Sequence, residues 1–210
     1  MKKATLALLC LLMSTAALAA DKVIKLPKPD MNRPGTVMKA LADRQSTREY
    51  ATKALSLSDL SDLLWAANGV NRPDGRRTAP SAMNKQDVDI YVVFPQGSYL
   101  YDAKQNQLTL VAEGDHRAAV ASRQDFAKVA PVCLVLVSDM ARMGDPKQPN
   151  VRQMCAADVG IVSQNISIFC AAAKLGTVPR AYMEVEQLKK ILKLSEHQVP
   201  ILNHPVGYLK

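Results

Sequence analysis

Aromatic side chains are scarce in this chain of 210 residues. They make up 5% of it, so a hydrophobic core has to be built mainly from aliphatic side chains and methionine. Glycine (9 residues) and proline (12 residues) are also few, while hydrophobic residues reach 48%. This composition excludes a collagen-like, disordered or coiled-coil chain, and it suits one or at most two globular domains.

The sequence also lacks the short motifs of many common active sites. It contains no GxGxxG after a strand, no P-loop, no GxSxG and no HExxH. The three histidines, His116, His197 and His204, are scattered and have no cluster of cysteines or carboxylates beside them. We therefore expect no metal site. Sequence alone leaves a Ser–His–Asp triad open, although nothing points to one, and the catalytic residues stay unknown.

Cysteine is rare, and its spacing disfavours disulfides. Beyond Cys10 the chain has Cys133, Cys155 and Cys170, with no CxxC pair. Cys155 and Cys170 fall in one predicted helix, where fifteen residues span about 22 Å. A disulfide needs Cα atoms within about 7 Å, so these two cannot pair within one chain. We expect three buried, hydrophobic cysteines; an intermolecular bridge or a reactive thiol is the alternative.

The first nineteen residues have the pattern of a secretory signal peptide. Lys2 and Lys3 precede an apolar stretch from Ala4 to Met13, and small residues follow, ending in Ala17-Leu18-Ala19. The stretch is too short to span a bilayer, which takes about 20 residues, and no later run is expected to reach that length. A buried N-terminal helix is the alternative. We expect export to the periplasm after cleavage at Ala19, without stable membrane insertion.

The remaining residues predict one α+β domain. Residues 20–35, with three prolines, are expected to form an extended lead-in rather than a packed element, and the domain then runs over residues 36–210. Apolar periodicity predicts helices over 36–44, 58–68 (capped by Ser58), 117–126, 151–174 and 185–193. Alternating or apolar runs predict strands over 88–94, 97–101, 107–112, 131–138 and 206–209.

The helix predicted over 151–174 is apolar on nearly every side. Such a helix is expected to be buried all round, which is difficult in a chain of this size without a partner subunit.

Three short constellations could bind a ligand. The first, Arg44-Gln45-Ser46-Thr47-Arg48, places two guanidiniums around a hydroxyl, which suits an anion; a solvated basic turn is the alternative. The second, residues 76–86, offers backbone and side-chain donors before a buried strand and could hold a planar ligand. The third, residues 174–180, leaves the long helix, and a plain helix stop at Gly176 would explain it.

Together these constellations resemble the FMN-dependent nitroreductase family over residues 36–209. The family's R-x-S-x-R, P-S-x-x-N-x-Q, D-x-G-x-x-x-Q-N, L-G-T-x-P and P-V-G-Y motifs occur here in order. Their residues are Arg44, Ser46 and Arg48; Pro80, Ser81, Asn84 and Gln86; Asp158, Gly160, Gln164 and Asn165; Leu175 to Pro179; and Pro205 to Tyr208. Residues 65–71 and 77–82 look closest to the branch that includes thiazoline and oxazoline dehydrogenases.

The resemblance implies a central mixed β-sheet flanked by helices, with the long buried helix at a homodimer interface and two FMN sites there. It also implies ping-pong chemistry: NADH or NADPH gives a hydride to flavin N5, and a small-molecule acceptor such as a nitro-compound or quinone takes the electrons. Arg48 would stabilise the reduced flavin near N1. The implied FMN contacts are Arg44, Gln45, Ser46, Arg48, Pro80, Ser81, Ala82, Met83, Asn84, Gln86, Thr177, Val178, Pro179 and Arg180, with the 80–86 loop coming from the other subunit.

Some departures favour an alternative function. Gln45 stands where the family often has a basic residue, and Ala181-Tyr182 replaces a frequent Glu-Gly pair. FMN is made in the cytoplasm, whereas this chain is expected to be exported unfolded. The alternative is an exported, non-catalytic protein of the same fold that binds flavin or another ligand.

The positive charge does not indicate nucleic acid. Lys and Arg number 27 against 19 Asp and Glu, a net charge of +8; without Lys2 and Lys3 the count is 25 against 19, or +6. No aromatic platform interleaves the basic residues, as single-strand binding would need.

Overall fold

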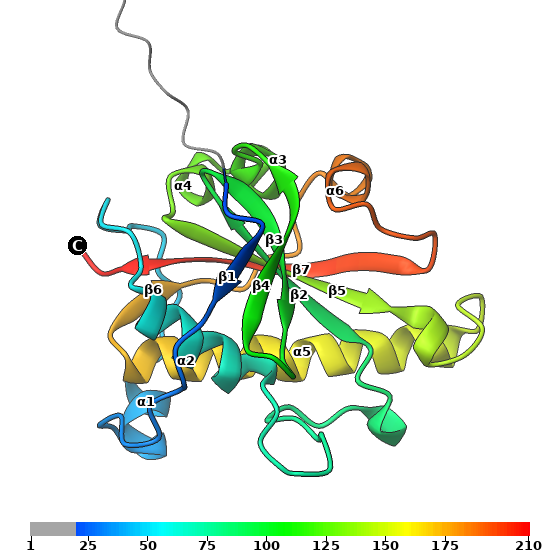
Figure 1. Ribbon diagram of the computed structural model, residues 1–210, viewed down its shortest axis with the longest axis horizontal. Helices are drawn as coiled ribbons and strands as arrows, with labels where there is room; N and C mark the ends of the chain where they lie inside the picture. Colours follow the sequence, from blue (N-terminus) through cyan, green and yellow to red (C-terminus); the bar gives the residue numbers. More distant parts are fainter. Residues whose placement is uncertain (1–19) are drawn as a thin grey trace, which may run out of the picture.

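A computed structural model describes residues 20–210, which form one seven-stranded sheet with the strand order β1-β4-β3-β2-β5-β7-β6 (Figure 1). The strands are β1 (Val23–Lys25), β2 (Val88–Phe94), β3 (Gly97–Asp102), β4 (Gln107–Glu113), β5 (Val132–Asp139), β6 (Leu175–Thr177) and β7 (Gln198–Tyr208). The α+β class is confirmed. The sheet was expected to be mixed, but every pairing is antiparallel. Tight turns join β2, β3 and β4, and such turns connect antiparallel strands only.

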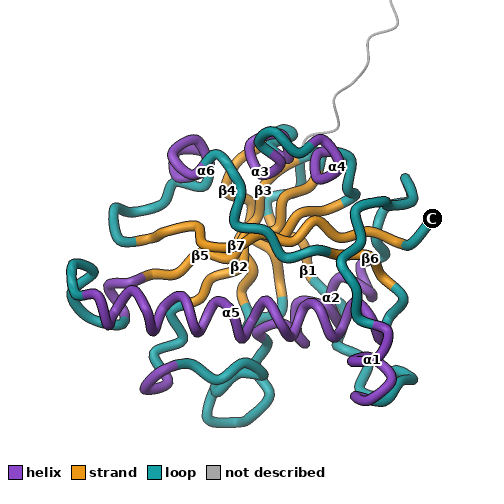
Figure 2. The backbone as a smooth tube through the Cα atoms, turned by 180° about the vertical axis from the view of Figure 1, so that it is seen from behind, coloured by secondary structure: helices purple, strands orange, loops and turns teal. Residues whose placement is uncertain are grey.

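Helices cover both faces of this sheet. They are α1 (Val37–Asp43), α2 (Leu57–Asn68), α3 (Arg117–Ala121), α4 (Asp125–Lys128), α5 (Pro149–Ala172) and α6 (Val185–Ile191), with 3₁₀ turns η1 (Ala82–Asn84) and η2 (Met140–Arg142). Helices α1, α2 and α5 lie on one side of the sheet, and α3, α4 and α6 lie on the other (Figures 1 and 2). Each side has its own buried aliphatic core.

Several predicted boundaries were wrong for local reasons. The lead-in is packed, since β1 pairs with β4 as an edge strand and Leu26 is buried behind it. The helix expected over 117–126 is two short helices, because Ser122 takes the left-handed conformation (φ 51°) and ends α3. Strand β7 begins at Gln198 rather than 206; Pro200 and Pro205 in this strand obscure its pattern in the sequence.

Helix α5 is buried on one side only. Val159, Val162 and Ile166 face the sheet and α2, whereas the opposite side of small residues and glutamine is exposed. A Cβ placed on Gly160 would meet no heavy atom within 4 Å. The expectation of all-round burial therefore fails within a single chain. Helix α5, with 24 residues and an 18-residue window of mean hydropathy 1.4, also reaches the length and composition of a membrane span, contrary to expectation. In this chain it is a core helix packed on the sheet.

The three described cysteines are free and buried, as expected. Burial raises the pKa of the Cys133 thiol to about 12, so this sulfur behaves as a small hydrophobic group. The predicted signal peptide, residues 1–19, lies outside the described residues.

The N-cap of α2 gives a direct test of the local structure. Ser56, not the expected Ser58, is the cap, and its Oγ accepts a hydrogen bond from the Asp59 N–H at 3.0 Å. We predict that Ser56→Ala lowers the free energy of unfolding by about 1 kcal/mol in urea titrations. Ser58→Ala is the matched control and should leave it within about 0.5 kcal/mol. A larger loss in the control would contradict the cap assignment.

Candidate functional site

The 44–48 run follows α1 and is fixed against β6. The Thr47 N–H donates to the Thr177 carbonyl at 2.9 Å, and the Tyr50 hydroxyl donates to the Thr47 carbonyl at 2.7 Å. Gly176 permits this close approach, because a Cβ there would come within 2.9 Å of the Thr47 side chain. The structure thus brings together the first and third predicted constellations.

The end of α5 differs from the predicted helix stop. Gly176 belongs to β6, and the left-handed residue after the helix is Lys174, with φ 56°. A non-glycine residue in this conformation costs about 1 kcal/mol. The strained position sets Lys174 in the lining of the cavity beside the 44–48 run.

That cavity has a volume of about 400 Å³ and lies between the 44–48 run, the end of α5 and β6. Arg44, Gln45 and Thr177, all predicted site residues, are part of its lining. Asp43 also lines it but is paired with Lys39 at 2.5 Å. Among residues 20–210, Arg44, Arg48 and Lys174 form no ion pair. Of these three cations, Arg44 and Lys174 belong to the lining, and their unpaired charges fit an anion. Arg48 and the predicted site residue Ser46 do not line the cavity.

Arg180 has a different role from the one predicted. Its side chain is 6% exposed, and its guanidinium donates to Gln124, Asn203 and the Val120, Ala121 and Tyr182 carbonyls. With its donors used inside the chain, it holds α3 and β7 together and cannot also grip a ligand. The guanidiniums of Arg180 and Arg48 both lie near the Phe126 ring, 5.4 and 5.8 Å from its centroid, so this ring helps to place the exposed Arg48.

Sequence reasoning missed His204, a fully buried residue of β7. Its Nδ1 lies 3.1 Å from Thr177 Oγ1, and its Nε2 lies 2.7 Å from Ser163 Oγ. Thr177 Oγ1 donates its proton to the Pro205 carbonyl, so Nδ1 must carry the ring proton and Nε2 accepts from Ser163. Burial lowers the pKa of His204 to about 3, which keeps the ring neutral. These hydrogen bonds connect Thr177 of β6 through His204 to Ser163 of α5.

The second predicted constellation forms a separate region, loop 80–86. Met83, Asn84 and Gln86 have left-handed φ angles of 52°, 53° and 49°. Ser81 Oγ accepts from the Gln86 N–H at 2.8 Å, and the Ala82 N–H donates to the Asp158 carboxylate of α5 at 2.9 Å. Strained residues held in place by their neighbours are typical of ligand-binding segments.

Loop 80–86 does not meet the 44–48 run within one chain. The loop attaches to α5 at Asp158, whereas Ser167 to Lys174 line the cavity. Nine to sixteen residues separate these points, or about 14–24 Å along the helix. The loop instead projects past α5 on the side away from the sheet (Figure 1), and Met83 is 65% exposed.

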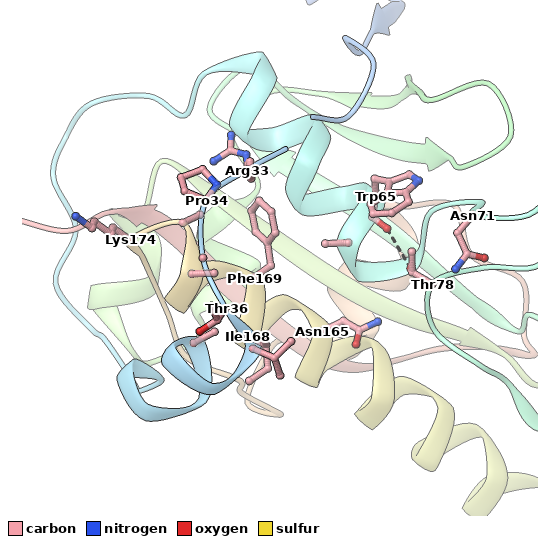
Figure 3. A pocket seen from close by; sticks show the side chains of 16 residues that line it. Arg33, Pro34, Thr36, Trp65, Asn71, Thr78, Asn165, Ile168, Phe169 and Lys174 are labelled. Atoms are coloured by element: carbon pink, nitrogen blue, oxygen red, sulfur yellow. Dashed lines mark hydrogen bonds between the residues drawn. The ribbon is translucent and has the colours of Figure 1, made fainter. Parts of the chain in front are cut away.

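A larger cavity of about 680 Å³ lies between α1, α2 and the last turns of α5 (Figure 3). Trp65, Phe169 and Ile168 provide much of its apolar lining, and Arg33, ion-paired with Asp59 at 2.5 Å, lies at its edge over the Phe169 ring. Val37 and Met38 on α1 are 69% and 75% exposed. Exposed apolar side chains gathered beside an apolar cavity are typical of an interaction surface.

No group of three or more metal-binding side chains occurs within residues 20–210. The sequence pattern of the nitroreductase family matches residues 41–208. The chain belongs to the nitroreductase family. Since its homologues are named as nitroreductases, the family indicates an oxidoreductase.

Individual relatives agree with this assignment. A nitroreductase-like protein of Methanocaldococcus jannaschii is 30% identical over 176 residues, which cover 80% of this chain and 88% of that protein. The crystal structure of a nitroreductase-like protein from Ralstonia eutropha is 38% identical, with a TM-score of 0.83 over 90% of each chain. An NADPH:FMN oxidoreductase of Vibrio harveyi, solved with NAD⁺, shares the fold at 19% identity with a TM-score of 0.61, over 82% of this chain and 68% of that one.

From the burial of His204 we predict a contribution to the free energy of unfolding that is lost at low pH. Its pKa in the folded chain lies below its ordinary value of 6.5, so the unfolded chain binds a proton that the folded chain does not. Its contribution is therefore retained above about pH 6.5 and is lost as pH falls towards 3. In urea titrations, the stability difference between wild type and His204→Gln should shrink by at least 1 kcal/mol from pH 7 to pH 5. A constant difference for His204→Gln would contradict the buried neutral ring.

Proposed function

We propose that this chain is an FMN-dependent oxidoreductase that accepts hydride from NADH or NADPH and reduces a small-molecule acceptor, such as a nitro-compound or quinone. The observation that carries the proposal is the 44–48 run, which is fixed to β6 and whose Arg44, without an ion pair among residues 20–210, lines a cavity of about 400 Å³ together with Lys174. Bound FMN would supply the hydride-accepting ring system, while the protein supplies binding and orientation. Residues 65–71 and 77–82 favour the thiazoline and oxazoline dehydrogenase branch.

The residues around the cavity divide into binding and supporting groups. Arg44, Ser46 and Arg48 would bind the phosphate and ribityl chain, with Gln45 beside them. Thr177, Val178 and Pro179 would lie along the ring, because the turn that contains them is fixed by His204 and by the Thr47 N–H. Arg48 offers a positive charge at the rim, where an electron-rich group would be stabilised. Arg180 supports this turn from inside.

We further propose that the working unit is a homodimer. Loop 80–86 and the 44–48 run are about 14–24 Å apart along α5, so Pro80, Ser81, Ala82, Met83, Asn84 and Gln86 would have to reach the cofactor from the other subunit. The exposed side of α5 around Gly160, the apolar α1 and the cavity of about 680 Å³ lie on one side of the chain and form a surface that a second copy would cover.

Export is also part of the proposal. The first nineteen residues have a signal-peptide pattern, and a periplasmic enzyme would have to acquire FMN after export.

One alternative has support in the structure: a non-catalytic protein of the same fold that binds flavin or another ligand. It is favoured by the internal use of the Arg180 donors, which leaves one cation fewer for a phosphate.

Reconstitution with FMN tests the proposed cofactor. We predict that the chain from Ala20 onward binds FMN and that Arg44→Ala with Arg48→Ala raises the dissociation constant at least 100-fold, because each charge-assisted hydrogen bond contributes about 1.5–3 kcal/mol. Flavin fluorescence titration measures the constants. Lys104→Ala with Arg123→Ala removes the same charge elsewhere and should not change it.

The same titrations can also contradict the proposal. Unchanged affinity in the double variant would overturn the phosphate assignment, and no FMN binding by wild type would reject the cofactor. If the loaded protein is yellow but neither NADH nor NADPH bleaches it, the non-catalytic alternative is supported.

A substitution at Gly160 tests the dimer. Gly160→Arg fits the isolated chain but places a bulky charge on the exposed side of α5. We predict that it converts a dimer into a monomer in sedimentation experiments and weakens FMN binding at least tenfold, while the secondary structure is retained. Gln105→Arg, in the exposed β3–β4 turn, is the matched control. A wild-type monomer that binds FMN would contradict the dimer.

A further inference from the structure

Two buried carboxyl groups lie where loop 80–86 joins the core. Asp158 of α5 is 4% exposed, and both of its carboxylate oxygens accept from the Ala82 N–H, at 3.1 and 2.9 Å. Asp87, at the end of the loop, is fully buried, and its Oδ2 accepts from Ser138 Oγ at 2.6 Å. Its other oxygen, Oδ1, is buried without any hydrogen-bond partner among the described residues.

An unpartnered buried carboxylate oxygen beside a second carboxyl group needs an explanation, because two like charges cannot both be buried cheaply. Asp158 lies within hydrogen-bonding reach of Asp87. A proton held between the two groups would satisfy the orphaned Oδ1 and remove one charge. Burial, together with Asp87 and against the Ala82 N–H, raises the pKa of Asp158 to about 6, in agreement with this arrangement.

The surrounding groups do not neutralise the pair in another way. From β5 comes the Ser138 hydroxyl, and from α5 comes the Cys155 thiol. Burial raises the pKa of this thiol, a hydrogen bond with Ser138 lowers it, and the charge and hydrogen bonding of Asp87 raise it, so the thiol is a neutral donor beside Asp87. Arg142 of η2 exerts its charge on Asp87, but it is ion-paired with Asp89 at 2.8 Å and with Asp139 at 3.1 Å. The site is therefore a pair of acids with neutral neighbours and a cation already committed to two other carboxylates.

We propose that Asp158 and Asp87 share one proton in a buried carboxyl–carboxylate hydrogen bond, and that this pair positions loop 80–86 for ligand binding. The pair fastens the loop at both ends, since Asp158 holds the Ala82 amide and Asp87 follows Gln86 directly in the chain. Release of the shared proton to solvent leaves two charges that repel each other and loosens the strained residues between them. Only the link to FMN rests on the function proposed above.

The direction of the pH dependence follows from the raised pKa. Between about pH 4 and pH 6 the folded chain keeps a proton that an ordinary aspartate in the unfolded chain has released. The contribution of the pair to stability is thus complete below about pH 4 and is lost as pH rises through about 6. His204 acts in the opposite direction over an overlapping range, so the wild-type profile alone is not diagnostic. A comparison of variants at each pH isolates the pair.

The test uses hydrogen exchange of the Ala82 amide in the FMN-free protein, corrected for the intrinsic pH dependence of exchange. In wild type we expect protection to fall at least fivefold from pH 5 to pH 7.5. In Asp158→Asn, whose amide can donate to Asp87 and accept from Ala82, protection should stay constant. Asp158→Ala should lose protection at both pH values. Asp115→Asn, a remote exposed acid, should keep the wild-type pH dependence.

A second readout measures FMN affinity over the same range. We expect the wild-type dissociation constant to rise at least fivefold above pH 6 while that of Asp158→Asn stays flat. Equal pH dependence of Ala82 protection in wild type and Asp158→Asn would overturn the shared proton, whether or not FMN binds. If exchange behaves as expected but FMN affinity does not follow it, the positioning role is overturned. If no FMN binds, the proposed cofactor fails, while the exchange experiment still decides the pair.

Discussion

The rise of an α-helix sets the geometry on which the candidate site depends. Helix α5 runs along one face of the sheet for 24 residues and is anchored there by Val159, Val162 and Ile166. Its first half holds loop 80–86 through Asp158, and its last turns line the cavity of the 44–48 run. Because each residue adds about 1.5 Å along a rigid helix, the distance between these two regions is fixed. A rigid spacer of this kind keeps the loop and the cavity as two separate regions of one chain.

Buried polar groups fix the backbone around the cavity. Thr177 is held by His204, and the backbone around Arg180 is held by its guanidinium and by Asn203. Each of these groups would be costly to bury alone, and each is satisfied by a partner from a distant part of the chain. The 44–48 run is different, since its backbone is pinned but its charged ends are left unpaired. Order in the backbone combined with unused charge is what a phosphate site requires.

The sequence predicted those features that depend on local periodicity. The strand expected over 88–94 matches β2 residue for residue, and α1 and α5 agree within two residues, because apolar spacing sets both. Features that depend on residues far away in the chain could not be predicted from the sequence. His204 sits in a strand interrupted by prolines, and nothing in its neighbours reveals that Ser163 and Thr177 complete its hydrogen bonds. The cap at Ser56 rather than Ser58 was likewise decided by backbone geometry.

Motif resemblance predicted which segments form the site but could not say how each side chain is used. Arg44 and Arg180 were both predicted as FMN contacts, yet Arg44 lines the cavity and Arg180 is buried with its donors engaged. The difference arises from α3, whose carbonyls reach Arg180 only after the chain folds. Lys174, outside the predicted set, shows the reverse: a strained left-handed position carries its charge to the cavity. The positive charge at this site thus depends on tertiary hydrogen bonding as much as on the motif itself.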